Sequence, residues 1–105
     1  MKDFGSFFTV DNRIFDFGLK PRDIAVYCCI CRHINQRTGV AFPSRRKIAK
    51  ECGIGKTDTV DKAILTLTEK GLLIKHHQMR PDGGYGSNIY TLSDFGGMDT
   101  SKEGR

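Results

Sequence analysis

The sequence predicts a mainly helical α+β domain, and three patterns in its 105 residues lead to that class. Stretches of helical length with apolar faces occupy the middle of the chain. Two of these stretches are joined by the short segment 53–55, whose two glycines indicate a tight turn. Two shorter stretches that can form strands follow, separated by a glycine-rich connection, as in a β-hairpin. The expected architecture is therefore three helices with a small hairpin.

Residues 1–18 are predicted to form an N-terminal aromatic arm. They carry an unusual load of large apolar side chains, namely Phe4, Phe7, Phe8, Val10, Ile14, Phe15 and Phe17. A free tail would not carry so much apolar surface, because it could not bury it. The arm is therefore expected to fold back onto the domain.

The first helix is expected to begin near Pro21, because proline suits the first turn and Asp23 is favourable near the positive end of a helix. Residues 24–34 are apolar almost all round, and a helix without a polar face is covered on several sides. The arm can cover one side, and a second copy of the chain can cover another. A homodimer through this helix or the arm is one expectation.

The second helix is expected to follow Ser44, which is placed as its N-cap. Residues 40–42 can form a short strand before it, and Pro43 holds the preceding residue in extended geometry. Gly53 fits the left-handed position that ends the helix.

The first turn of this helix carries Arg45, Arg46 and Lys47, although the helix dipole disfavours cations there by about 0.3–1 kcal/mol each. In a capping box the position of Lys47 would hold Glu or Gln. A phosphate lying across the helix start would explain these charges, and a solvated basic face is the other interpretation.

The third helix is predicted over residues 57–70. Its inward stripe is formed by Val60, Ala63, Ile64 and Leu67, which recur at the spacing of one helix face. Gly71 is suited to end the helix in the same way as the glycine of the preceding turn.

A strand is expected over residues 73–79, which alternate in polarity, and a second strand over residues 89–92. The glycine-rich connection 80–88 makes the hairpin a projecting wing. The polar residues 94–105 are interpreted as a disordered tail or a linker cut short. The domain proper is thus expected to span residues 19–93.

Positive charge is concentrated in one third of the chain. The whole sequence has a formal net charge of +5, whereas residues 20–50 hold eight basic and one acidic side chain. This asymmetry predicts a positive face of the kind that binds nucleic acid. No apolar run is long enough to cross a bilayer and no secretory signal is present, so a cytoplasmic location without membrane contact is expected.

The four cysteines are expected to be reduced thiols in that compartment. A metal ligand set can be assembled on paper from Cys28, Cys29, Cys31, Cys52, His33, His76 and His77. The signal for a zinc site is nevertheless poor, and small buried core residues are the favoured role of the cysteines. No metal and no cofactor is expected.

The segment Gly55-Lys56-Thr57 invites comparison with a nucleotide-binding loop. Such a loop follows a strand and has another glycine five residues before Gly55, where this chain has Lys50 and a helix pattern. No carboxylate pair or nucleophile–histidine arrangement has a suitable spacing. The chain is therefore expected not to be an enzyme.

Two short helices joined by a glycine turn, with positive charge at the start of the first, have the layout of a helix-turn-helix, and the hairpin makes it a winged helix. Further matching segments are Phe7–Val10, Ile14–Asp16, Leu19–Asp23, Thr38–Gly39, Phe42–Ser44, Ile48–Gly53 and Leu67–Ile74. With these segments the chain resembles, over residues 7–92, the N-terminal DNA-binding domain of bacterial, plasmid and phage replication initiators and replisome organisers. The resemblance implies binding to double-stranded DNA in replication initiation or transcriptional regulation, with replisome proteins as further partners.

The chain departs from that pattern at the start of the third helix. Gly55 stands where the family has serine, and one additional residue shifts the helix start to Thr57 or Asp58. Asp58 and Asp61 lie where DNA contacts would fall, and carboxylates repel phosphates, although an aspartate can accept a hydrogen bond from cytosine N4. A winged helix that binds protein within a larger replication or regulatory assembly is therefore the alternative function.

Three groups of side chains are predicted to contact DNA. The second helix would hold phosphates with Arg45, Arg46 and Lys47; the third would face the major groove with Lys56, Thr57, Thr59, Lys62 and Thr66; and the wing would contact phosphate or the minor groove with Lys75, Arg80, Tyr85 and Asn88. Each basic residue taken alone is equally well explained as a solvated side chain, so the prediction depends on their convergence on one face.

Overall fold

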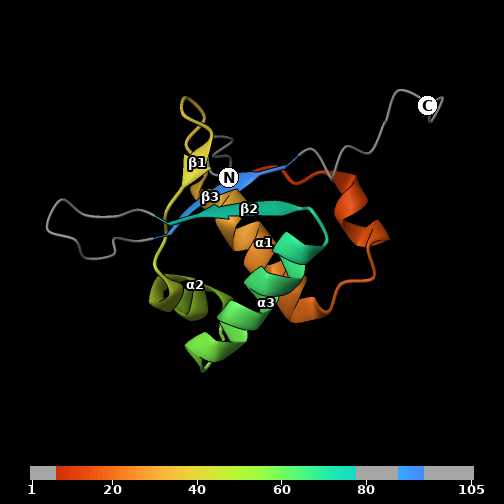
Figure 1. Ribbon diagram of the computed structural model, residues 1–105, viewed down its shortest axis with the longest axis vertical. Helices are drawn as coiled ribbons and strands as arrows, with labels where there is room; N and C mark the ends of the chain where they lie inside the picture. The colour runs from red at the N-terminus through yellow and green to blue at the C-terminus, as the bar shows by residue number, and fades with distance from the viewer. Residues whose placement is uncertain (1–6, 78–87, 94–105) are drawn as a thin grey trace, which may run out of the picture.

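The computed structural model describes residues 7–77 and 88–93. In chain order the elements are the 3-10 helix η1 (Asn12–Asp16), α1 (Pro21–His33), β1 (Val40–Ala41), α2 (Arg45–Cys52), α3 (Thr57–Glu69), β2 (Leu73–His76) and β3 (Ile89–Leu92) (Figure 1). Three α-helices and a small antiparallel sheet confirm the predicted mainly helical α+β class. The architecture is that of a winged helix-turn-helix.

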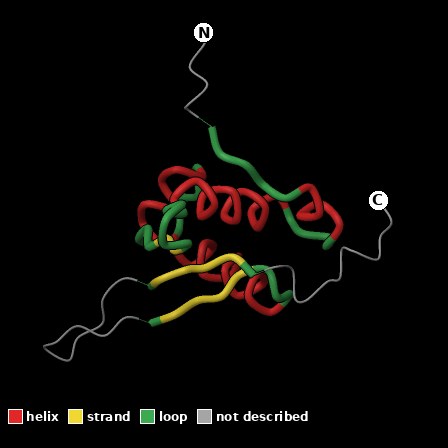
Figure 2. Tube along the Cα trace, turned by 90° about the horizontal axis from the view of Figure 1, so that it is seen from above, coloured by secondary structure: helices red, strands yellow, loops and turns green. Residues whose placement is uncertain are grey.

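The three strands form one antiparallel sheet in the order β1-β3-β2. Val40 of β1 faces Thr91 of β3, and Leu73 of β2 faces Leu92 at the other side of β3. Figure 2 shows β2 and β3 lying together along one side of the helices. Both outer strands are shorter than predicted. β1 stops before Phe42, and β2 ends at His76, while residues 78–79 lie outside the described part of the chain.

The hydrophobic core lies where α1 and α3 pack together beneath the sheet. All four residues of the predicted stripe on α3, Val60, Ala63, Ile64 and Leu67, are buried. They meet Val26 and Ile30 of α1, Ile48 of α2 and the fully buried ring of Tyr90 on β3. Each fully buried aliphatic side chain stabilises the fold by about 1.5–3 kcal/mol, so this cluster holds α3 in place.

The N-terminal segment is only partly folded onto this core. Ile14 of η1 is completely buried, and Val10 and Phe17 pack against the core. In contrast, the side chains of Phe7 and Phe15 are 70% and 72% exposed. This segment therefore contacts the core through Val10, Ile14 and Phe17, while the rings of Phe7 and Phe15 stay at the surface. In a 3-10 helix successive side chains point about 120° apart, so burial of Ile14 turns its neighbour outward.

η1 is held by a short-range ion pair. The Asp11 carboxylate accepts hydrogen bonds from the backbone N–H of Arg13 at 2.9 Å and from its Nη2 at 2.7 Å. The hydrogen bond to the Arg13 side chain is the main reason that the pKa of Asp11 falls from 3.8 to about 2. Because the folded-state pKa is lowered, this contact stabilises the fold above pH 3.8 and is lost as the pH falls toward 2.

We predict that Arg13→Gln raises the pKa of Asp11 part of the way back toward 3.8. The substitution removes the guanidinium while the backbone hydrogen bond stays, so recovery should be incomplete. An NMR titration of the Asp11 carboxyl measures this, with Arg22→Gln as a variant that leaves both contacts of Asp11 intact. An unchanged Asp11 titration in Arg13→Gln would contradict the assignment.

Candidate nucleic-acid interface

The turn between α2 and α3 sets the relative position of the two helices. The side-chain oxygen of Ser44 accepts a hydrogen bond from the backbone N–H of Lys47 at 3.0 Å and caps the start of α2. At its end Gly53 adopts φ 69° and ψ 28°, the predicted left-handed conformation. The N–H of Ile54 then donates to the carbonyl of Ala49 at 2.8 Å, which satisfies a carbonyl that the helix end leaves open. α3 can therefore start within a few residues, at Thr57.

A forked ion pair connects the first turn of α2 to α3. Arg45 donates from Nε to Oδ1 of Asp61 at 2.8 Å and from Nη2 to Oδ2 at 3.0 Å. The same Nη2 lies 3.4 Å from the hydroxyl of Thr57, one helical turn earlier on α3. About half of each charged side chain is exposed, so the pair contributes little to stability, at most about 1 kcal/mol. Its importance is geometric, because it fixes a cation of α2 on the exposed face of α3.

The other two cations at the start of α2 differ in their surroundings. Lys47 Nζ lies 3.8 Å from the Glu51 carboxylate, one turn further along α2. Arg46 is exposed and has no acidic partner among the described residues. Of the three predicted phosphate contacts on α2, Arg46 is thus the one whose charge is fully available to an external anion.

The exposed face of α3 is mixed in charge. Lys56 and Lys62 are exposed, as predicted for groove contacts, whereas Thr59 and Thr66 are half-buried. Thr57 is also half-buried and is engaged by Arg45. The same helix exposes Asp58, Asp61, Glu69 and the 57%-exposed side chain of Leu65.

The predicted wing residues fall partly within the described chain. Lys75 is exposed on β2 and faces Tyr90 across the sheet. Asn88 is half-buried, and its Nδ2 donates a hydrogen bond to the Tyr90 hydroxyl at 3.4 Å. Its side chain therefore already has a partner inside the protein. Arg80 and Tyr85, which were also predicted to contact DNA, lie outside the described residues.

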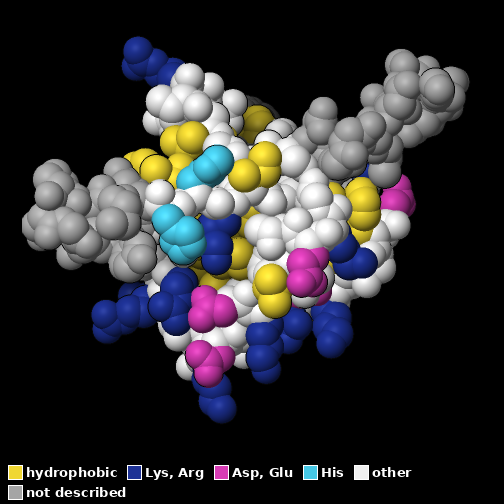
Figure 3. All heavy atoms as spheres, viewed as in Figure 1, with side chains coloured by type: hydrophobic (Ala, Val, Ile, Leu, Met, Phe, Trp, Pro, Cys, Tyr) yellow, Lys and Arg dark blue, Asp and Glu magenta, His cyan; other side chains and the backbone are white. Residues whose placement is uncertain are grey.

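The basic side chains of α2 and α3 gather on one side of the molecule. In Figure 3, Lys and Arg side chains lie along the lower edge, where Figure 1 places α2 and α3, and Asp and Glu side chains lie among them. Basic side chains of these two helices therefore lie on the same side of the molecule. It is a charged surface with acidic interruptions, and not a uniformly positive one.

Comparison of the sequence with models of known protein families identifies the family of this chain. The model described as a helix-turn-helix domain matches residues 18–73, which is more than half of the chain. The chain belongs to the helix-turn-helix domain family. Membership of this family supports DNA binding in general. No match to the chain was found among curated proteins.

The matched region of this helix-turn-helix domain contains α1, β1, α2 and α3 and ends at the first residue of β2. It therefore contains the glycine turn and the Arg45–Asp61 pair, while β3 lies beyond it. Within the described residues, no helix has the length and apolarity needed to cross a bilayer.

Sequence reasoning missed two groupings of this helix-turn-helix domain. It gave Asp61 no partner, although Asp61 receives the fork of Arg45. It also missed a cluster around Glu51, whose Oε1 lies 2.9 Å from His33 Nε2, 3.3 Å from Cys29 Sγ and 3.5 Å from Arg32 Nη1. The hydrogen bond with His33 is the main reason that the pKa of Glu51 is lowered. Burial is the main reason that the pKa of the Cys29 thiol is raised. The only sequence signal for the cluster was the i, i+4 spacing of Cys29 and His33 on α1.

Proposed function

We propose that this chain binds double-stranded DNA sequence-specifically and acts in replication initiation or transcriptional regulation of a bacterium, phage or mobile element. The role is one of binding in the cytoplasm, without catalysis. Family membership supports DNA binding in general. The resemblance of residues 7–92 to replication initiators supports the more specific role. A homodimer or replisome proteins would be the additional partners of such a module.

The observation that carries the proposal is the forked contact of Arg45 with α3. It ties the start of α2, the helix turn that also carries the exposed Arg46, to Asp61 and Thr57 in the N-terminal half of α3. In helix-turn-helix proteins the N-terminal residues of the second helix reach base edges, while the first helix crosses the phosphate backbone. The chain offers Lys56 and Lys62 for the first task and Arg46 for the second.

We expect Asp61→Asn to raise the affinity for duplex DNA by about threefold to tenfold at low salt. The change removes a negative charge from the contact surface and releases Arg45 to bind phosphate. Fluorescence anisotropy with a labelled duplex measures the affinity. The matched control is Glu69→Gln, which removes an exposed acidic charge at the far end of the same helix and should have a smaller effect. Weaker binding by Asp61→Asn would show instead that Asp61 holds Arg45 in the orientation that DNA requires.

Selection of bound duplexes from a random pool tests the proposed specificity. Enrichment of one sequence, followed by a salt titration on that duplex, is the expected result. If six phosphates are neutralised, the slope of log K against log salt concentration is about −5. A pool that shows no enrichment despite salt-dependent binding would overturn specificity, while absence of binding in dilute buffer would overturn the function itself.

The selected sequence also separates the two biological roles. Repeated sites beside an A·T-rich segment in the genome that encodes the chain would support replication initiation, because A·T-rich duplex is easier to open. Single sites that overlap promoters would support transcriptional regulation.

The second candidate function is a protein-binding winged helix. It is favoured by the exposed Leu65 on α3, which lies among Asp58, Asp61 and Glu69. An apolar centre surrounded by charged groups is typical of a protein contact surface. Leu65→Ala should leave duplex affinity nearly unchanged if α3 binds DNA through Lys56 and Lys62, and should abolish partner binding if α3 binds protein.

A further inference from the structure

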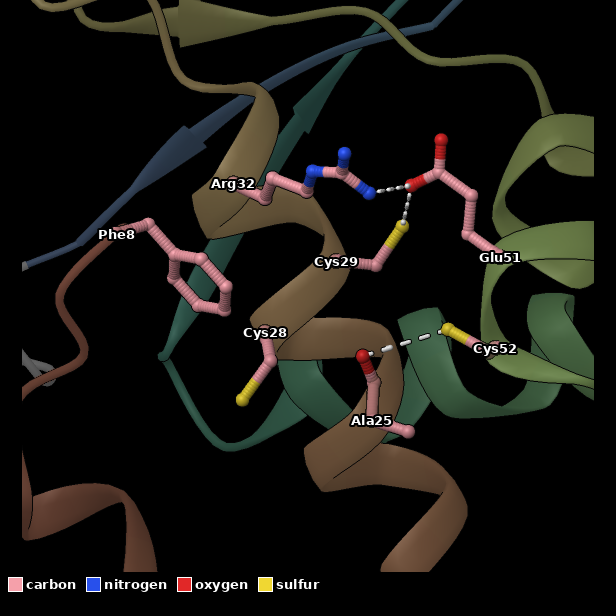
Figure 4. Close-up of a pocket in the computed structure, with 7 residues that line it drawn as sticks. All are labelled: Phe8, Ala25, Cys28, Cys29, Arg32, Glu51 and Cys52. Carbon is pink, nitrogen blue, oxygen red and sulfur yellow. Dashed lines mark hydrogen bonds and ion pairs between the residues drawn. The ribbon is translucent and has the colours of Figure 1, made fainter. Parts of the chain in front are cut away.

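A second cluster of chemically active side chains lies between α1 and α2, behind the proposed DNA contacts. Cys29 and His33 are one turn apart on α1 and therefore project from the same face. Glu51, near the end of α2, points back toward them, and Figure 4 shows its carboxylate meeting the Cys29 thiol. Sγ of Cys29, a ring nitrogen of His33 and a carboxylate oxygen of Glu51 all lie within 4.8 Å of one another.

We propose that Cys29, His33 and Glu51 form a Zn²⁺ site that joins α1 to α2. A thiolate, an imidazole and a carboxylate are the three kinds of ligand that zinc takes in proteins, at about 2.0–2.3 Å. Such bond lengths place tetrahedral ligand atoms about 3–4 Å apart. The present separations of 3.3 Å for Cys29 Sγ to Glu51 Oε1 and 2.9 Å for His33 Nε2 to Glu51 Oε1 are close to that spacing. Only small side-chain movements are needed to admit the ion.

The charges and protons of the site balance. Cys29 gives its thiol proton to solvent as the sulfur–zinc bond forms, and His33 binds through the lone pair of a neutral ring nitrogen. The thiolate and the Glu51 carboxylate together cancel the two charges of the ion. Arg32 and Lys47, which now face the same carboxylate, would then lose most of their attraction to it. Zinc binding would thus release a cation in the first turn of α2.

The surroundings leave room for a fourth ligand and a path to the site. A cavity of about 330 Å³ beside the cluster is lined by Cys28, Cys29, Arg32, Glu51 and Cys52, with Phe8 and Ala25 (Figure 4). The Cys52 thiol donates to the carbonyl of Ala25 at 3.4 Å, so we leave it out of the ligand set. Water from the cavity completes the coordination, which gives three protein ligands and one open position.

The direct test is titration of the full chain with Co²⁺ and then Zn²⁺ in a reducing buffer that does not bind metals. We expect one equivalent of Co²⁺ to produce thiolate-to-cobalt charge-transfer absorption, which Zn²⁺ then abolishes. Cys29→Ser should lose this absorption, and His33→Gln should weaken Zn²⁺ affinity at least about tenfold. The matched control is Cys28→Ser, which removes a neighbouring thiol at the same cavity and should bind the metal like the parent chain.

Thermal unfolding provides a second measurement that does not depend on absorption. A ligand that binds only the folded state raises the melting temperature, so at the same Zn²⁺ concentration the parent and Cys28→Ser should be stabilised more than either ligand variant. Circular dichroism first establishes that each variant is folded without metal. Retention of one equivalent of Zn²⁺ at parental affinity by folded His33→Gln, or a cobalt complex without thiolate absorption, would overturn the proposal.

Discussion

Arg46→Glu is expected to weaken duplex binding at least about tenfold at moderate salt while the domain stays folded. Arg46 is exposed in the first turn of α2, and no acidic group of the described residues neutralises it. Charge reversal both removes a phosphate contact and places a carboxylate against the DNA backbone. We choose Arg46 and not Arg45 because a glutamate at Arg45 would face Asp61 and disturb the contact between α2 and α3.

The control for this substitution is Arg37→Glu, which changes the net charge by the same amount. Arg37 is exposed in the loop between α1 and β1, which lies at the opposite end of the molecule from α2 and α3 (Figure 1). Anisotropy titrations of both variants at several salt concentrations separate a local contact from a general charge effect. Equal losses of affinity in the two variants would remove Arg46 from the contact surface.

Gly53→Val is expected to produce the largest loss of stability. At φ 69° a residue with a Cβ is strained, and a β-branched residue more so, which costs about 1–3 kcal/mol. For a domain of this size each kcal/mol corresponds to a fall of about 4–8 °C in melting temperature. A Cβ placed on Gly53 would meet no atom within 4 Å, so the expected loss is due to the backbone conformation and not to a steric clash.

Gly55→Val is the matched control, two residues further along the same turn. A Cβ at Gly55 also meets no atom within 4 Å, and its backbone is not in the left-handed region. Thermal denaturation should therefore show a much smaller change than for Gly53→Val. Similar melting temperatures for the two variants would mean that residue 53 can leave the left-handed conformation without loss.

The elements of this fold were predictable wherever their signals are local. The stripe of Val60, Ala63, Ile64 and Leu67, the cap at Ser44 and the left-handed Gly53 depend on neighbours within a few residues, and all three are confirmed. The 3-10 helix η1 was missed because one buried residue, Ile14, supports it and no periodicity reveals such a short element.

The candidate site was less predictable because its contacts join distant residues. Positive charge at the start of α2 was visible in the sequence, but the partner of Arg45 is Asp61, on the next helix. From the sequence alone, an aspartate on α3 is read as a DNA contact or as a repulsive charge. Only the packing of α2 on α3 shows that it neutralises an arginine of the protein itself. The same reasoning applies to Glu51, whose partners on α1 lie 18 and 22 residues away.

The position of β3 determines when the sheet can form during translation and how far the C-terminus can be shortened. β3 is the last strand along the chain but the middle strand of the sheet, and it carries the fully buried Tyr90. During translation β1 and β2 therefore have no strand to pair with until residues 89–92 have left the ribosome. Pairing of β1 with β3, which closes a long loop, is then a late step of folding. A fragment truncated at residue 73, where the family match ends, would leave β1 unpaired and would lack the Tyr90 ring that fills the core.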